Sequence, residues 1–205
     1  FEQITRRPGL KKVLAGLEAA VATLPSVKVN VVVMRGFNDQ ELPVFADLAA
    51  RWPLTVRFIE LMPFDARQVW KTGRFFSAER IIGALQGALP GLLEDRGSST
   101  EEHVFRVPGA PGKLAVIPAY TRSLCRGCDR IRLTADGQLR NCLFSQRDFD
   151  LRGLLRGGGS PAEIGAFVQQ AMALKLVDGW AAQREAEGMG DEAGRTRTSM
   201  TEIGG

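Results

Sequence analysis

Three cysteines are the residues of this 205-residue chain best suited to chemistry, and they lie within 18 residues of one another. Cys125 and Cys128 have the Cys-x2-Cys spacing, and Cys142 follows after thirteen residues. This spacing predicts two thiols on a tight turn and a third on the returning strand of a hairpin, where all three can meet at one metal centre. An odd cysteine count does not suit a disulfide framework. A metal-binding role in a reducing compartment, such as the cytoplasm, is therefore expected.

The number of thiols separates the candidate metals. A closed structural zinc site needs four ligands, and the single histidine, His103, lies 22 residues before Cys125 in a strand-like segment. A zinc site that includes His103, or three cysteines without metal, are the alternatives. We favour an iron-sulfur cluster, because three thiolates leave one iron open for a ligand that is not protein. An open iron can bind a substrate directly.

Arginines surround the cysteines. Residues 120–156 contain eight Arg, four Asp and no Lys, so this window has a formal charge of +4. Arg130 and Arg132 are expected to point to the same side of a strand that follows Cys128. A guanidinium group binds phosphate through two parallel hydrogen bonds, so the pair can hold the phosphates of a ligand beside the metal. The alternatives are a solvated basic face and cross-strand ion pairs to carboxylates such as Asp136.

The first part of the chain is expected to form a parallel βαβ unit that carries polar residues on one strand. Lys28 and Asn30 share a face of that strand, opposite a row of valines. Polar side chains on a central parallel strand are costly unless a ligand contacts them, so this face is predicted to line a ligand cavity. An edge strand with one solvated face is the alternative. We expect helices over 8–24 and 39–52, the second capped by Asn38, and strands over 27–34 and 54–61.

The second part is expected to mix short strands and helices. A helix capped by Ser77 should end near residue 89, and the capping box from Ser160 to Glu163 should open a helix that runs to residue 177. The sequence from Gln183 onwards is polar and lacks periodicity, which predicts a flexible tail. Strands are expected over 104–107, 114–118, 131–134 and 138–143, and domains over 1–78 and 79–182, followed by a tail over 183–205.

These motifs together resemble the C-terminal portion of the GTP 3′,8-cyclase (MoaA) family, radical S-adenosylmethionine lyases of molybdenum cofactor biosynthesis. The resemblance covers nearly all 205 residues, and the cysteine array combined with Arg-x-Arg and a terminal Gly-Gly is highly specific. The matching segments are VKVNVVVMRGFND, VRFIELMPFD, FRVPG, the Cys-x2-Cys-x13-Cys array with RIRLTADGQLRNCLF, and Ile203-Gly204-Gly205.

The resemblance implies an α/β fold, in which the C-terminal part of an incomplete (β/α) radical S-adenosylmethionine barrel precedes a smaller α+β domain with an auxiliary [4Fe-4S] cluster. The open iron of that cluster would receive the guanine of GTP. The implied cluster ligands are Cys125, Cys128 and Cys142, the implied GTP contacts are Lys28, Arg130, Ile131 and Arg132, Met62 would pack on S-adenosylmethionine, and Gly204 and Gly205 would enter the active site.

The sequence also departs from the family pattern. It contains no Cys-x3-Cys-x2-Cys motif, which in this family holds the second [4Fe-4S] cluster that cleaves S-adenosylmethionine. We therefore expect a truncated chain that is inactive alone, and whose exposed edge strand favours aggregation or pairing, as in a homodimer. In the family, the product passes to cyclic pyranopterin monophosphate synthase.

Two rival functions stay open at this point. One is another radical S-adenosylmethionine enzyme with an auxiliary cluster and a different substrate. The other is a small module that is stabilised by a bound metal and binds nucleic acid through its Arg-rich hairpin. Aromatic residues make up only 7% of the chain, which is few for a base-stacking platform, so we expect no nucleic-acid partner. The longest apolar stretches are far shorter than the roughly 20 residues of a membrane span, so we expect no membrane either.

Overall fold

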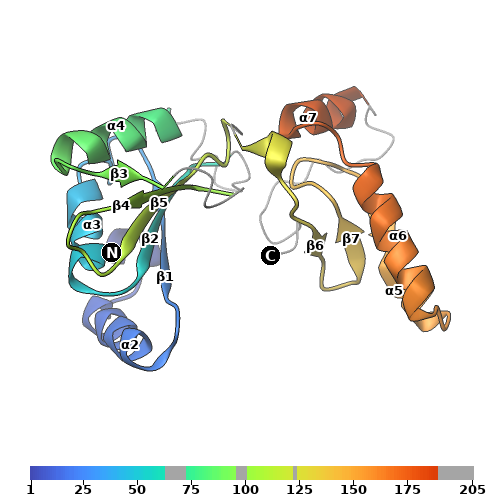
Figure 1. Ribbon diagram of the computed structural model, residues 1–205, viewed down its shortest axis with the longest axis horizontal. Coiled ribbons are helices and arrows are strands. Elements are labelled where there is room, and N and C mark those ends of the chain that lie inside the picture. Colours follow the sequence, from blue (N-terminus) through green and yellow to red (C-terminus); the bar gives the residue numbers. More distant parts are fainter. Residues whose placement is uncertain (63–72, 96–100, 122–123, 189–205) are drawn as a thin grey trace. The chain divides into compact units, whose positions relative to one another are not determined.

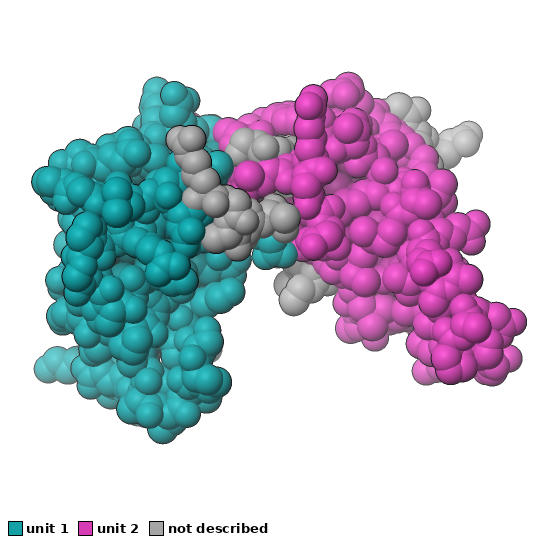
Figure 2. Space-filling view, in the orientation of Figure 1, with its two compact units in different colours: residues 1–60, 75–117 teal, residues 61–74, 118–205 magenta. Residues whose placement is uncertain are grey.

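The computed structural model describes residues 1–62, 73–95, 101–121 and 124–188. The chain divides into two compact units (Figures 1 and 2): residues 1–60 with 75–117, and residues 61–74 with 118–205. This division differs from the boundary expected at residue 78. The strands within residues 93–117 pair with the first sheet, and their apolar residues Phe105, Leu114 and Val116 complete its core.

Unit 1 is built on a five-stranded mixed sheet with the order β1-β2-β5-β4-β3. Strands β1, β2 and β5 are parallel, and helix α3 connects the first two, which confirms the predicted βαβ unit. Strands β4 and β3 complete the sheet in antiparallel pairing. The strands are β1 (Lys28–Val33), β2 (Thr55–Glu60), β3 (Leu93–Glu94), β4 (His103–Arg106) and β5 (Lys113–Ile117).

The three longer helices that the structure describes in unit 1 lie on one side of this sheet (Figure 1). Their apolar residues share a core with Val31, Val33, Phe58 and Phe105 of the strands. None of the helices in the described ranges has the length and apolar character needed to cross a membrane. The helices are α1 (Glu2–Thr5), α2 (Leu10–Thr23), α3 (Leu42–Arg51) and α4 (Ala78–Ala88), of which the last begins after the predicted cap Ser77.

The predicted cap at Asn38 is wrong. Helix α3 begins at Leu42 without a side-chain cap. The Oδ1 atom of Asn38 instead accepts from the main-chain N–H of Met34 at 2.8 Å, and its Nδ2 donates to the carbonyl of Val32 at 3.0 Å. An asparagine side chain offers both a donor and an acceptor, so it can satisfy the main-chain groups left at the end of β1.

Strand β1 lies at the edge of the sheet. Lys28, Asn30 and Val32 are exposed on it, whereas Val31 and Val33 are buried. The predicted alternation is therefore confirmed, and the polar face of β1 is exposed, as the edge-strand alternative requires.

Glu60 is a fully buried carboxylate at the end of β2. Its Oε1 atom accepts from the main-chain N–H of Ala78, the first residue of α4, at 2.6 Å. The first N–H groups of a helix have no partner within the helix, and the helix dipole favours a negative charge at this end. Glu60 therefore fixes the start of α4 against the strand that leads to Met62.

Glu60→Ala is expected to lower the free energy of unfolding by about 2 to 4 kcal/mol, because it leaves a cavity and a buried donor without its acceptor. Glu60→Gln keeps the shape and the acceptor oxygen, and should cost less than half as much. Urea unfolding followed by circular dichroism measures both variants. Equal losses in the two variants would contradict the acceptor role.

In its described residues, unit 2 contains a three-stranded antiparallel sheet and three α-helices. The predicted hairpin is confirmed, with Gly137 in the left-handed region at the turn (φ 85°). The predicted capping box is confirmed as well, but α6 ends at Ala173 rather than near residue 177. The elements are β6 (Arg132–Leu133), β7 (Gln138–Arg140), β8 (Phe149–Asp150), α5 (Leu151–Arg156), α6 (Pro161–Ala173) and α7 (Gly179–Gly188).

Helix α7 corrects the prediction that a flexible tail starts at residue 183. Asp178 caps it by accepting from the N–H of Ala181 at 2.8 Å, and Ala182 is buried. The ring of Trp180 meets that of Tyr120 edge to face, with centroids 5.4 Å apart. The contact between Tyr120 and Trp180 joins distant parts of the chain, so local periodicity could not reveal it. Gly204 and Gly205 lie outside the described residues.

Candidate functional site

Cys125 and Cys128 lie at the two ends of one tight turn in unit 2. Cys125 begins a short 3-10 helix, η2 (Cys125–Gly127), and the N–H of Cys128 donates to the carbonyl of Cys125 at 3.1 Å. The third cysteine, Cys142, follows β7. All three are partly buried, and none forms a disulfide bond. The predicted turn and hairpin are therefore both present.

The sulfur of Cys128 lies close to positive charge. Burial raises the pKa of this thiol, but hydrogen bonds from the main chain and side chain of Arg130 and the charges of Lys175 and Arg130 outweigh it, so the pKa lies below the ordinary value. The Nζ atom of Lys175 is 3.5 Å from this sulfur. The thiolate form of Cys128 is therefore easier to reach than that of an ordinary cysteine, and thiolates are the form of cysteine that binds metals.

The described residues contain no group of three or more Cys, His, Asp or Glu side chains placed to hold one metal ion. His103 belongs to β4 in unit 1, where its Nδ1 lies 3.4 Å from Oε1 of Glu94, so this structure gives no support to a zinc site with His103. A four-iron cluster makes a different demand, because each thiolate binds a different iron. Three thiols, one of them with a lowered pKa, fit that donor chemistry, and their joint ligation of a cluster stays a prediction.

Arg130, Ile131 and Arg132 follow the cysteine turn in an extended segment. Ile131 is 46% exposed, whereas the two arginines are partly buried, which agrees with both guanidinium groups lying on one side. Strand β6 includes only the second of them, Arg132. Because Arg130 also donates to the sulfur of Cys128, the structure brings the predicted metal ligand and the predicted phosphate ligand into contact.

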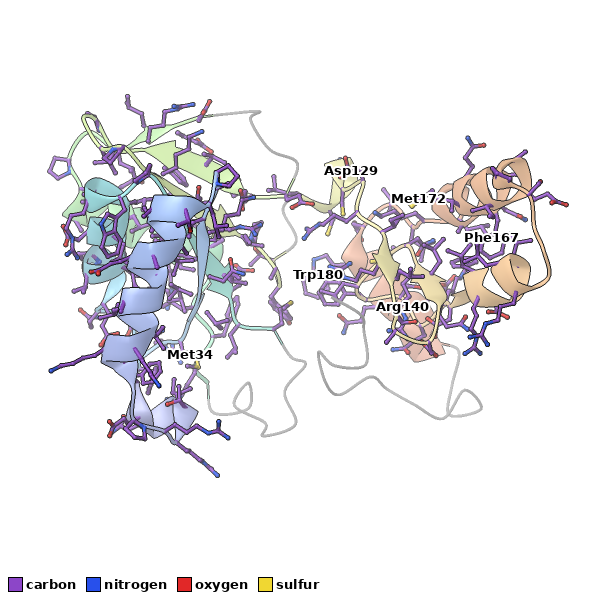
Figure 3. All side chains as sticks on the ribbon, turned by 90° about the horizontal axis from the view of Figure 1, so that it is seen from below. Met34, Asp129, Arg140, Phe167, Met172 and Trp180 are labelled. Atoms are coloured by element: carbon purple, nitrogen blue, oxygen red, sulfur yellow. The ribbon has the colours of Figure 1, made fainter. Side chains whose placement is uncertain are left out.

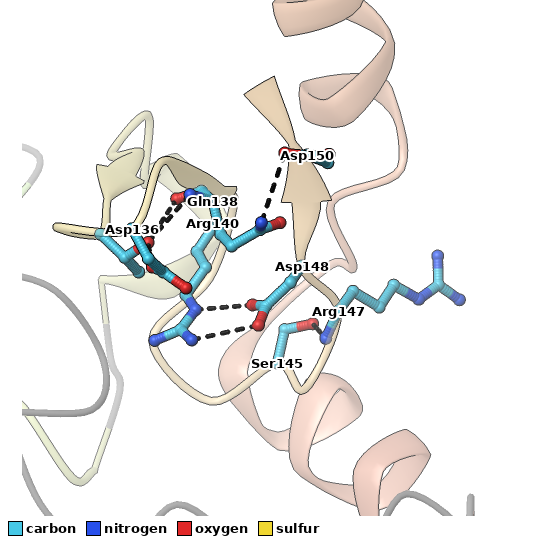
Figure 4. Close-up of polar contacts among 8 residues, drawn as sticks. Asp136, Gln138, Arg140, Ser145, Arg147, Asp148 and Asp150 are labelled. Atoms are coloured by element: carbon cyan, nitrogen blue, oxygen red, sulfur yellow. Dashed lines mark hydrogen bonds and ion pairs between the residues drawn. The ribbon is translucent and has the colours of Figure 1, made fainter. Parts of the chain in front are cut away.

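Other arginines of the basic window have structural partners (Figure 4). Arg140, whose side chain is 8% exposed, forms a two-pronged ion pair with Asp148: Nε to Oδ1 at 2.6 Å and Nη2 to Oδ2 at 3.1 Å. Arg147 pairs with Glu185 of α7. Asp136 accepts from the hydroxyl of Thr134, which lowers the pKa of this carboxyl. The positive charge that remains available to bind a phosphate is therefore smaller than the arginine count of this window suggests.

Two residues that the sequence analysis did not single out connect the cysteine segments to α6. Lys175 donates to the carbonyl of Cys128 at 2.8 Å, and Asn141, the residue before Cys142, donates through Nδ2 to the carbonyl of Ala171 at 2.7 Å. Figure 3 labels Asp129, which follows Cys128 in the sequence, and Met172, which follows Ala171. A lysine after a helix C-terminus is a familiar signal, but its pairing with a turn 47 residues away has no trace in the sequence pattern.

The remaining predicted residues are not all part of this cluster. Lys28 is exposed at the start of β1 in unit 1. Met62 is partly buried directly after the end of β2, and is grouped with unit 2. The predicted roles of Lys28 and Met62 toward GTP and S-adenosylmethionine therefore stay predictions.

Comparison with known proteins assigns these residues to a family. Residues 54–178 match the family model Molybdenum Cofactor Synthesis C. The chain is 39% identical over 207 residues to the GTP 3′,8-cyclase of Chlorobaculum tepidum, a match that covers the whole chain and 60% of that protein. It is 37% identical over 214 residues to the GTP 3′,8-cyclase of Desulforamulus reducens, covering the whole chain and 61% of the relative.

A mammalian protein also matches. Molybdenum cofactor biosynthesis protein 1 of Mus musculus is 39% identical over 178 residues, which cover 85% of the chain and 28% of the relative. The chain thus spans about 60% of the length of the bacterial relatives that it matches.

Proposed function

Because the chain belongs to the Molybdenum Cofactor Synthesis C family, we propose that it is the C-terminal part of a GTP 3′,8-cyclase. The reaction would convert GTP to (8S)-3′,8-cyclo-7,8-dihydroguanosine 5′-triphosphate, a lyase reaction of molybdenum cofactor biosynthesis. The contact between the thiol of Cys128 and Arg130 supports this proposal most directly. It joins a metal-binding group to a phosphate-binding group at one point.

The proposed cofactor is an auxiliary [4Fe-4S] cluster held by Cys125, Cys128 and Cys142. When bound, it would supply an open iron that can bind the guanine base. The residues of the chain would do the rest of the binding. Hydrogen bonds from Arg130 and the charge of Lys175 stabilise the thiolate form of Cys128, which favours metal binding at neutral pH.

The proposed role of the neighbouring residues is to fix GTP. Arg130 and Arg132 would bind the phosphates, with Ile131 between them, and Lys28 would add a further charge. Met62 would pack on S-adenosylmethionine, and Gly204 and Gly205 would complete the active site. Holding the substrate at both its base and its phosphates leaves the ribose in a fixed orientation, which is the main contribution that a protein makes to radical chemistry.

This proposal limits what the 205 residues can do alone. All three cysteines are assigned to one cluster, so none remains for the cluster that would cleave S-adenosylmethionine. We expect GTP binding without turnover. Incubation with reductant, S-adenosylmethionine and GTP should release no deoxyadenosine. In the intact enzyme the product would pass to cyclic pyranopterin monophosphate synthase.

Arg132→Ala is expected to weaken GTP binding by about tenfold or more, because a hydrogen bond to a charged group contributes about 1.5 to 3 kcal/mol. Equilibrium dialysis with the anaerobically reconstituted chain measures the affinity. Arg156→Ala is the matched control, since Arg156 is exposed at the end of α5. Unchanged affinity in Arg132→Ala would favour a radical enzyme with another substrate. Steeply salt-dependent binding to oligonucleotides, without preference for GTP, would favour the nucleic-acid module.

A further inference from the structure

The C-terminal end of α6 contacts both segments that carry cysteines. Asn141 immediately precedes Cys142, is 2% exposed, and donates to the carbonyl of Ala171 at 2.7 Å. This carbonyl is one of the last four of α6, which have no acceptor role within the helix. Lys175, two residues after the helix, contacts the turn that carries Cys128. The end of α6 and the residues just after it are therefore hydrogen-bonded to both cysteine segments.

Lys175 makes three contacts with the cysteine turn. Its Nζ donates to the carbonyl of Cys128 at 2.8 Å, to the carbonyl of Arg130 at 3.0 Å and to the sulfur of Cys128 at 3.5 Å. An ammonium group has three donors, so these contacts use all of them. Three acceptors in fixed positions hold a long side chain in one geometry. They also fix the main chain on both sides of Asp129, and with it the direction in which Arg130 leaves the turn.

We infer that Lys175 is a positioning residue, which holds Cys128 and Arg130 in register with one another and places a positive charge against the thiolate that binds the cluster. The inference rests on the proposed function, because it concerns the cluster and GTP. It goes further by assigning a role to a residue outside both the cysteine array and the Arg-x-Arg segment.

Two measurable consequences follow from this geometry. A hydrogen bond and a positive charge at a ligating sulfur stabilise the added electron of a reduced cluster, so Lys175 raises the reduction potential. The bonds to the two carbonyls keep the guanidinium of Arg130 beside the metal ligand, so Lys175 also strengthens GTP binding. Replacing a residue that contributes to stability alone would change neither the reduction potential nor the affinity for GTP.

The test compares Lys175→Met with Lys175→Arg in the anaerobically reconstituted chain. Lys175→Met keeps an unbranched side chain only one atom shorter, but removes the charge and the donors. It should lower the midpoint potential by about 59 mV, which is a tenfold change for a one-electron couple, and weaken GTP binding about tenfold. Lys175→Arg retains the positive charge but has a different donor geometry, so its midpoint potential should fall by less than half as much as that of Lys175→Met.

Potentiometric titration followed by electron paramagnetic resonance gives the potential, equilibrium dialysis gives the affinity for GTP, and iron and sulfide assays count the cluster. Lys12→Met is the matched control, because Lys12 is exposed on α2 in unit 1. If Lys175→Met does not fold, Lys175→Gln replaces it, since Gln also lacks the charge, and the same fall in potential is expected.

The outcomes separate this inference from the proposed function. A wild-type chain that takes up no iron and sulfide refutes the proposed cluster itself. A wild-type chain with a cluster, together with a folded Lys175→Met variant of unchanged potential and unchanged GTP affinity, overturns the role of Lys175 alone. A fall in potential in Lys175→Arg as large as that in Lys175→Met would also overturn it, because Lys175→Arg keeps the positive charge.

Discussion

Cys128→Ala should reduce the iron bound after anaerobic reconstitution from about four atoms per chain to less than about one, and should abolish the visible absorption of the cluster. Three thiolates are already one fewer than the usual four ligands, so the loss of one leaves too few bonds to hold the cluster. Arg130 and Lys175 also lower the pKa of the Cys128 thiol, which favours the thiolate form that binds metals. Iron and sulfide assays with a visible spectrum measure the result.

Arg126→Ala is the control for this experiment. Arg126 lies between the two cysteines of the turn and is exposed, so its replacement changes the same turn without removing a thiol. We expect it to keep the iron content of the wild type. Full iron binding by Cys128→Ala, or a colourless wild-type chain loaded with zinc, would contradict the cluster assignment.

Gly112→Ala is expected to lower the free energy of unfolding by about 3 kcal/mol or more, or to prevent folding. A Cβ atom at this position would lie 2.5 Å from the carbonyl oxygens of Leu54 and Trp52 and 2.7 Å from that of Ala49. Main-chain atoms cannot move aside as a flexible side chain can, and overpacking of this kind costs at least about 1 to 3 kcal/mol. The N–H of Gly112 also donates to the carbonyl of Ala49 at 3.0 Å, which ties the start of β5 to the end of α3.

Gly83→Ala provides the same substitution with the opposite expectation. Gly83 lies inside α4, and a Cβ atom there would meet nothing within 4 Å. Alanine is the better helix former, so this variant should gain about 0.5 to 1 kcal/mol. Urea unfolding of both variants measures the difference. A Gly112→Ala variant as stable as the wild type would contradict the close packing at the start of β5.

Local signals predicted the elements that depend on neighbours in sequence. Ser77 and Ser160 accept from N–H groups three residues later, so each cap is complete within one helical turn. The hairpin after the cysteine turn likewise depends on Gly137 at its own tip. The cysteine spacing and the Arg-x-Arg segment are also local, so a short stretch of sequence is enough to point to the candidate site.

Contacts between distant residues could not be predicted in this way. Asparagine is a residue type that often caps helices, but the side chain of Asn38 forms hydrogen bonds with main-chain groups at the end of β1 instead. Helix α7 has little apolar periodicity, and is held instead by the Tyr120–Trp180 and Arg147–Glu185 contacts. Lys175 contacts the cysteine turn, and Asn141 contacts α6, only because α6 folds back against the hairpin. In each case a partner distant along the chain or in another element determines where the residue or helix packs, and the sequence pattern does not reveal that partner.

The bonds from the end of α6 to the cysteine segments have a consequence for the order of assembly. A ribosome makes the chain from its N-terminus, so all three thiols are synthesised before Lys175. Closing the long loop between Cys128 and Lys175 costs chain entropy that is recovered only when α6 docks. Until then the nascent thiols have neither the anchoring ammonium nor the helix end beside them. The proposed cluster would therefore be assembled after the folding of unit 2, and its three cysteines would have to stay reduced until then.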